Sequence, residues 1–169
     1  MRYGKARSAR SARSWRTGLL IPVVAILCGA QGCESPTAPD RSEDVRIVLG
    51  VSGGLAGADW QLTIDGQRAR IVGDRCREGI GCDWSAGEVL ATTDELRLIA
   101  LARRFVEDGF LDLSETDYGT ECCDQFGYEL TYVDTDDDRT VLGSDGTLPD
   151  AVLQLIGEVH AFVQEARGG

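Results

Sequence analysis

Residues 45–57 read Val-Arg-Ile-Val-Leu-Gly-Val-Ser-Gly-Gly-Leu-Ala-Gly, a β-branched apolar run that breaks into a glycine-rich loop. The run from Val45 to Val51 favours extended backbone and has the length of one strand. Three of the six residues in the following loop, 52–57, are glycines, which adopt positive φ without strain. We therefore predict a strand that ends in a loop with Leu55 as its apolar tip. The pattern fits a flexible strand connection, and it also fits a loop that contacts a partner.

Strand patterns continue on both sides of a predicted helix. Trp60–Ile64 alternates and meets Asp65-Gly66, a signal for a two-residue hairpin, so Gln67–Val72 is the expected returning strand. The following stretch, 73–87, carries four glycines and two cysteines and is predicted as a long loop.

A second hairpin is predicted further along the chain. Residues 128–133 alternate, an acidic turn follows, and 139–142 forms the return strand.

Two helices complete the expected order. Thr92 and Glu95 match a capping box, an apolar face runs from Leu98 to Val106, and Gly109 supplies the stop. The last helix follows Asp145-Gly146, with Thr147 as the expected cap and Pro149 in the first turn. The order β-β-β-α-β-β-α predicts an α+β fold, with a small antiparallel sheet of four to five strands and two helices packed on one face.

The first 32 residues have the pattern of a signal peptide. A basic segment without acids precedes about a dozen mostly apolar residues, which is too short for a lasting transmembrane helix. The sequence Ala30-Gln31-Gly32-Cys33 resembles a relaxed bacterial lipobox, so Cys33 is the predicted lipidation site. Residues 33–44 are polar, contain two prolines and suit a tether between the lipid and the domain. Ordinary cleavage to a soluble secreted protein is the alternative.

The remaining 137 residues suffice for one domain, which we place at 45–166. All 28 acidic residues lie at or after Glu34, together with only 11 of the 17 basic ones, for a formal charge of −17 and no lysine. Such a surface disfavours binding to nucleic acid, which needs a cationic footprint. It also disfavours peripheral adhesion to anionic lipid, so we expect membrane contact through the anchor alone.

Four cysteines are expected in the oxidising envelope, namely Cys76, Cys82, Cys122 and Cys123. Their even number favours disulfides. We favour cross-bridges from the 76–82 loop to the segment before strand 127–133, while local closure of Cys76 to Cys82 stays open. A four-thiolate zinc site is the weaker alternative, because the spacing lacks the usual pairs.

Candidate catalytic groups are few. The chain has one histidine, His160, on the flank of the last helix, and we expect it to be half-buried or on the surface. Common nucleophile and metal motifs are missing, so we expect no enzyme activity and no cofactor, with a carboxylate-pair glycosidase as a minor alternative. Asp134, Asp136, Asp138 and Asp145 partly match a calcium loop, but position 6 is Arg139 instead of glycine, so a solvated turn is favoured.

The glycine loop resembles the emfourin-like proteins, a bacterial family whose founding member inhibits thermolysin-like metalloproteases. The family pattern Ser-Gly-Gly-Phe-Ala-Gly differs only at Leu55 from the loop here. Similar features are a helix with an aromatic plug from Leu101 to Phe110, an Asp-x-x-x-Tyr strand entry at Asp124–Tyr128, and a Pro-led terminal helix after Pro149. The insert Gly73–Gly87 is not part of that pattern. The layout is also similar to uncharacterised bacterial lipoprotein domains.

The resemblance implies a partner-binding loop made of Ser52, Gly53, Gly54, Leu55, Ala56 and Gly57. The expectation is a non-catalytic envelope lipoprotein that inhibits or binds a thermolysin-like metalloprotease. The alternative is a cell-surface binding or structural domain with another envelope partner.

Overall fold

The computed structural model describes residues 37–77, 82–119 and 124–169. Residues 34–169 form one compact unit. It begins with a short 3₁₀ helix, η1, within the segment expected to be the tether. The elements in chain order are η1 (Ser42–Asp44), β1 (Arg46–Gly53), β2 (Ala58–Asp65), β3 (Arg70–Cys76), β4 (Glu88–Thr92), α1 (Glu95–Glu107), β5 (Phe126–Val133), β6 (Asp138–Ser144) and α2 (Asp150–Gly168).

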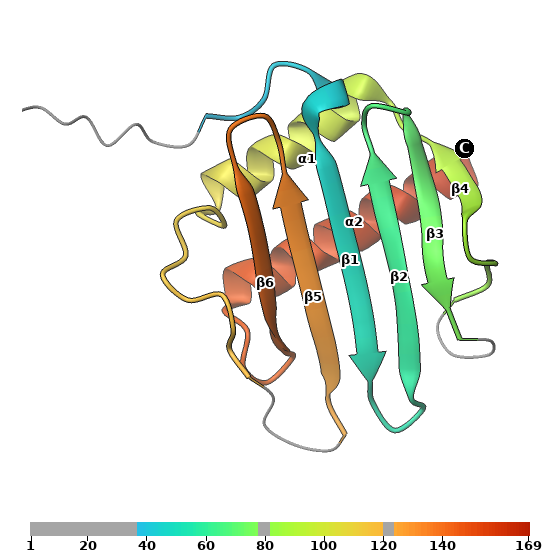
Figure 1. Cartoon of the computed structure of the whole chain (residues 1–169), viewed down its shortest axis with the longest axis vertical. Helices are drawn as coiled ribbons and strands as arrows, with labels where there is room; N and C mark the ends of the chain where they lie inside the picture. Colours follow the sequence, from blue (N-terminus) through green and yellow to red (C-terminus); the bar gives the residue numbers. More distant parts are fainter. Residues whose placement is uncertain (1–36, 78–81, 120–123) are drawn as a thin grey trace, which may run out of the picture. The chain divides into compact units, whose positions relative to one another are not determined.

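The six strands form one antiparallel sheet in the order β4-β3-β2-β1-β5-β6. Both helices cover the same face, and no helix of the described residues covers the opposite face, called the open face below (Figure 1). The α+β class and the placement of both helices on one face are therefore confirmed. Among the described residues, no helix is both long and apolar enough to cross a bilayer.

The core lies between the sheet and the helices. Strand β1 sits at its centre, where Ile47, Leu49 and Val51 are buried and lie in register with apolar residues of β2 and β5. From the other side, α1 and α2 present one apolar stripe each, as their sequence periodicity predicts. Within the described residues, every buried apolar side chain lies between positions 45 and 163, inside the 34–169 unit. The helix residues of this core are Leu98, Leu101, Ala102, Phe105, Val152, Leu155, Ile156, Val159, Phe162 and Val163.

The predicted count of four to five strands was too low, because β4 was not anticipated. Its five residues, Glu88–Thr92, are only half-buried or exposed and have no clear alternation. The strand forms by pairing with β3, and a bulge near Ile71 adjusts the register. A short edge strand of this kind depends on a long-range partner, which local sequence patterns do not reveal.

The β2–β3 hairpin exists, but its predicted two-residue turn was wrong. Asp65 pairs with Arg70, so four residues form the turn and the return strand begins three residues later than expected. Gly66 serves close packing here: its N–H donates to the Val45 carbonyl at 3.0 Å, and a Cβ would overlap the Ser42 carbonyl oxygen. Positive φ falls on Ala69 instead, at 49°.

Both predicted helix caps were also misplaced. The N-cap of α1 is Asp94, whose carboxylate accepts a hydrogen bond from the Arg97 backbone N–H at 2.9 Å, while Thr92 ends β4. Helix α2 begins after Pro149 with no side-chain cap. Thr147 closes the preceding turn instead, since its hydroxyl accepts from the Ser144 N–H at 2.8 Å.

We predict that Gly66→Ala lowers the free energy of unfolding by about 2–3 kcal/mol, because the added methyl must displace the backbone of the 42–45 segment. Gly157→Ala is the matched control: this exposed glycine of α2 has free space at its Cβ, and alanine there stabilises by about 1 kcal/mol. Urea denaturation of the 34–169 domain measures both. Equal effects of the two variants would contradict the packing role of Gly66.

Candidate functional site

The loop singled out in the sequence forms the tip of the β1–β2 hairpin. Gly53 pairs with Ala58, so residues 54–57 make the turn, at the end of the sheet away from η1 (Figure 1). The Leu55 side chain is 88% exposed, the highest value among the exposed large apolar residues of the described chain. The turn therefore projects an apolar side chain into solvent.

The turn is held in one conformation by backbone contacts. The Gly57 N–H donates to the Gly54 carbonyl at 2.9 Å, and the Gly54 N–H donates to the Gln125 carbonyl at 2.9 Å. Gly53, Gly54 and Gly57 all have positive φ, between 66° and 85°. Because these bonds already order the turn backbone, the turn would lose less conformational entropy if another molecule bound it.

The Phe126 side chain supports the same turn from β5. A Cβ at Gly54 would lie 2.7 Å from the Phe126 ring, so the ring rests directly against the turn backbone. Phe126 is itself 38% exposed, which adds a second apolar group to this end of the molecule. No sequence signal identified Phe126, because its role depends on the pairing of β1 with β5.

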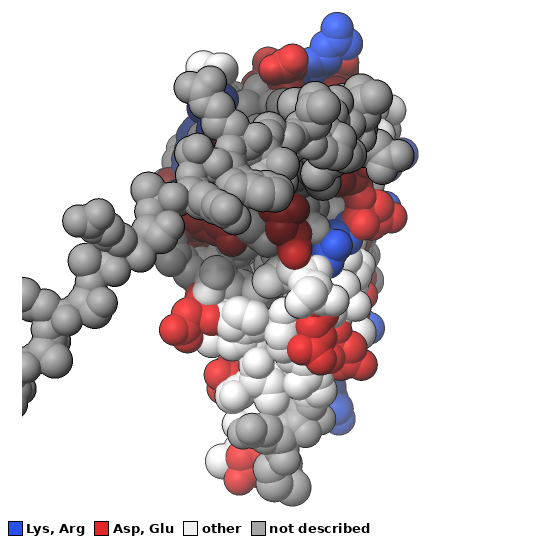
Figure 2. Space-filling view, turned by 90° about the vertical axis from the view of Figure 1, so that its left-hand side faces the viewer, with Lys and Arg blue, Asp and Glu red and all other residues white. Residues whose placement is uncertain are grey.

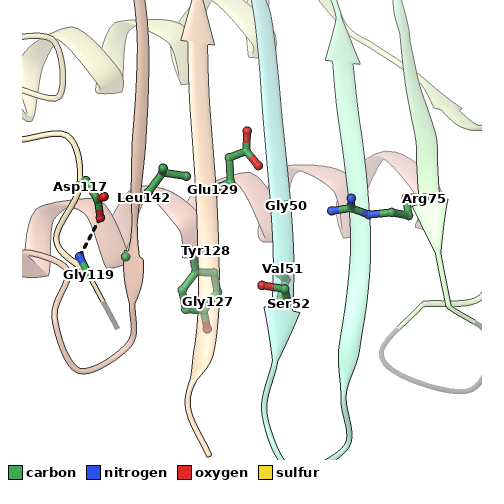
Figure 3. Close-up of a pocket in the computed structure, with 11 residues that line it drawn as sticks. Gly50, Val51, Ser52, Arg75, Asp117, Gly119, Gly127, Tyr128, Glu129 and Leu142 are labelled. Atoms are coloured by element: carbon green, nitrogen blue, oxygen red, sulfur yellow. Dashed lines mark hydrogen bonds between the residues drawn. The ribbon is translucent and has the colours of Figure 1, made fainter. Parts of the chain in front are cut away.

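A trough of about 420 Å³ begins beside the turn and crosses the open face of the sheet. Its floor includes Gly50 of β1 and Gly127 of β5, where missing side chains leave space. Figure 3 shows Arg75 and Glu129 reaching toward Gly50 from opposite sides. Arg75 is engaged by Asp59, with 2.8 Å between Nε and Oδ1.

The trough is lined by charged, hydroxyl-bearing and apolar residues. Ser52 and Tyr128 contribute hydroxyl groups to its lining, and Asp117 and Glu129 contribute carboxylates. The one histidine of the chain lies on α2, on the covered side of the sheet. The β6 side of the molecule shows more acidic than basic side chains (Figure 2). Among the described residues, no group of three or more histidines, cysteines or carboxylates is arranged to hold a metal.

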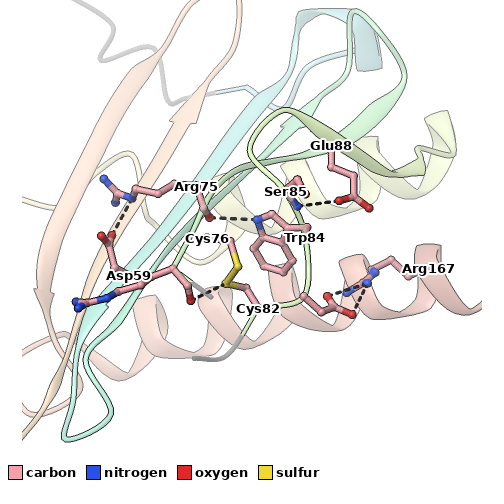
Figure 4. Close-up of a disulfide and its surroundings, with 10 residues drawn as sticks. Asp59, Arg75, Cys76, Cys82, Trp84, Ser85, Glu88 and Arg167 are labelled. Atoms are coloured by element: carbon pink, nitrogen blue, oxygen red, sulfur yellow. Dashed lines mark hydrogen bonds and ion pairs between the residues drawn. A yellow bond between two sulfur atoms is a disulfide. The ribbon is translucent and has the colours of Figure 1, made fainter. Parts of the chain in front are cut away.

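The predicted disulfide candidates divide between described and undescribed residues. Cys76 and Cys82 are joined, with their Cα atoms 5.9 Å apart, while Cys122 and Cys123 lie outside the described residues (Figure 4). The favoured cross-bridges from the 76–82 loop were therefore wrong, and local closure is what forms.

The described part of the cysteine-bearing insert packs on the sheet through Trp84. Its indole N–H donates to the Arg75 carbonyl at 3.1 Å (Figure 4). Its ring also meets the buried Trp60 edge-on, with 5.8 Å between the ring centroids. Asp83 forms an ion pair of 2.9 Å with Arg167 of α2. The described part of the insert is thus fastened to the β3 side of the fold, and Leu55 remains 88% exposed.

The acidic turn between β5 and β6 is a hairpin turn, as predicted. Asp134 accepts hydrogen bonds from the backbone N–H groups of Asp136 and Asp137, at 2.9 and 2.8 Å, and from the Tyr132 hydroxyl at 2.8 Å. Burial and the bond to Asp134 raise the Tyr132 pKa. Two other positions of the calcium template, Asp138 and Asp145, lie at opposite ends of β6, so they cannot share one ion.

His160 is half-buried on α2, as the sequence indicated, and its ring meets Trp60 edge-on at 5.3 Å. The predicted lipidation site, Cys33, lies outside the described residues. Comparison with known proteins adds no relative: no protein-family model matches the chain, and no curated protein matches it.

We predict that His160 makes the fold less stable as the pH falls. Burial lowers the His160 pKa because the imidazolium is poorly solvated beside Trp60. The unfolded chain therefore binds a proton near the ordinary histidine pKa of about 6.5, while the folded chain does so only at lower pH, and stability drops as pH falls through that window. The free energy of unfolding, measured by urea between pH 7.5 and 5.5, should fall less in His160→Gln. An identical pH slope in the two proteins would contradict this.

Proposed function

We propose that the protein is a non-catalytic lipoprotein of the bacterial envelope whose 52–57 loop binds the cleft of a thermolysin-like metalloprotease. The supporting observation is the presentation of Leu55, an almost fully exposed apolar side chain on a backbone-pinned turn. Clefts of proteases bind side chains in apolar subsites, and a narrow hairpin tip has the shape to enter one. The emfourin-like loop sequence supports the same target class.

The energetic case rests on burial of the tip. Enclosing a leucine side chain contributes about 1.5–3 kcal/mol, which corresponds to roughly ten- to a hundredfold in affinity. The three glycines keep the turn narrow, so Leu55 enters first and the backbone can approach the walls of the cleft. Phe126, seated behind the turn, adds apolar contact at the rim.

We predict that the 34–169 domain slows a thermolysin-like protease at micromolar concentration and that Leu55→Asp weakens the inhibition at least thirtyfold. The charged side chain loses the burial energy and adds a desolvation cost. Leu55→Phe keeps an apolar tip and should retain inhibition. The matched control is Leu96→Asp. Leu96 is also exposed, at 78%, but it lies on helix α1 and not on the β1–β2 turn.

Steady-state inhibition constants for the four proteins provide the measurement. If none of several thermolysin-like enzymes is slowed, the protease target is refuted, and capture of another envelope protein through the same loop becomes the better description. If Leu96→Asp weakens inhibition as much as Leu55→Asp, the loop is not the contact surface.

The proposed anchor at Cys33 places this domain at the membrane surface. Lipidation there adds acyl chains to a residue that precedes the polar segment before η1. We predict that Cys33→Ser shifts the protein from the membrane fraction to the soluble fraction. Cys28→Ser is the control and should leave it membrane-bound, because Cys28 lies in the apolar segment of the predicted signal peptide and follows the bulky Leu27. Fractionation followed by intact-mass measurement checks both variants. A wild-type mass without an added lipid would contradict the anchor and favour the secreted form.

A further inference from the structure

Three arginines surround one carboxylate on the open face of the sheet, near the β2–β3 turn. Asp65 lies in register with Arg46 of β1 on one side and with Arg70 of β3 on the other. Residues directly opposite one another in antiparallel strands point to the same face, so the three side chains form one row. Arg68, in the turn, adds a third guanidinium with its Nε 3.7 Å from Asp65.

These side chains line a cavity of about 340 Å³. The lining of this cavity is rich in hydrogen-bond donors, because the side-chain amide of Gln67 joins the three arginines there. Two carboxylates also line the cavity: Asp65 accepts from the Arg68 backbone N–H at 3.2 Å, and Asp74 accepts from the Thr63 hydroxyl. Three arginines and two carboxylates give the lining a net positive charge in a domain of strongly negative charge.

Arg70 carries the clearest sign of a missing ligand. Its Nε is buried and has no hydrogen-bond partner within the described part of the chain. A buried donor without an acceptor costs free energy, so such groups in folded proteins are nearly always satisfied. Arg46 likewise has no ion pair among the described residues. Most other arginines of the domain do have one: Arg41, Arg68, Arg75, Arg97, Arg104 and Arg167 each meet a carboxylate.

We propose that this cavity binds an oxyanion, a phosphate or carboxylate group held between Arg46 and Arg70. Guanidinium groups bind such anions through planar, charge-assisted hydrogen bonds, and an oxyanion would supply the acceptor that Arg70 Nε lacks. Gln67 can donate a further bond from the turn. The anion belongs either to a small metabolite or to a phospholipid headgroup, since both offer the same oxygens.

The site is independent of the proposed protease-binding loop. It lies by the β2–β3 turn, at the opposite end of the sheet from the β1–β2 turn that carries Leu55 (Figure 1). Leu55→Asp should therefore leave anion binding unchanged, and loss of anion binding should leave protease inhibition unchanged.

The test is an NMR titration of the ¹⁵N-labelled 34–169 domain with inorganic phosphate, at constant ionic strength maintained with chloride. The Nε–Hε resonance of Arg70 reports directly on the unsatisfied donor. We expect a saturable shift of this resonance, and we expect Arg46→Gln to raise the Kd about tenfold, the usual effect of losing one charge-assisted bond. Arg103→Gln is the matched control: it removes the same charge from an exposed position on α1, which covers the other face.

A shift that stays linear with phosphate, or that weakens equally in Arg46→Gln and Arg103→Gln, would overturn the proposal. Thermal melting of each variant verifies that the fold is retained. Arg70→Lys keeps the charge but loses the planar guanidinium group, so it should also bind phosphate less tightly.

A vesicle experiment distinguishes a phospholipid headgroup from a small anion. Competition between phosphatidylglycerol vesicles and phosphate would identify a headgroup, whereas phosphate binding without vesicle binding would identify a small anion.

Discussion

The pairing of β1 with both β2 and β5 is the constraint on which the rest of the structure depends. Strand β1 is central, and its three core side chains, Ile47, Leu49 and Val51, each lie in register with apolar residues on both sides. A slip by one residue would turn all of them to the open face, so burial determines the register strongly. That register places the β1–β2 turn, the Phe126 ring and the row of arginines around Asp65.

Binding surfaces in this protein come from the face and the turns that the helices leave uncovered. One side of the sheet is committed to the core, where α1 and α2 pack. The other side carries short and charged residues, with glycines that open a trough and arginines that line a second cavity. Because the two cavities and the Leu55 turn occupy different parts of one rigid sheet, separate ligands could bind without competing for the same residues.

The features that local patterns predict well are those with strong periodicity. The apolar stripe of α2, the alternation of β5 and the glycine turn after Val51 all appear as expected, because each is governed by residues near in sequence. Strand β4, the cap at Asp94 and the four-residue turn at Gly66 were missed or misplaced. Strand β4 depends on its pairing with β3, and the turn depends on the Ser42 carbonyl, both distant in sequence. The cap moved to Asp94 because Thr92 belongs to β4.

By itself, the sequence determined the α+β class, the exposed character of the 52–57 loop and the acidic, lysine-free surface, since composition and short-range patterning suffice for these. Only the tertiary structure decided that Cys76 closes on Cys82, because the spacing of the cysteines in the sequence left both local closure and cross-bridges open. It also decided that Arg46 and Arg70 flank Asp65. Arg46 and Asp65 are far apart in the sequence and become neighbours only through strand register, which the formation of the whole core selects.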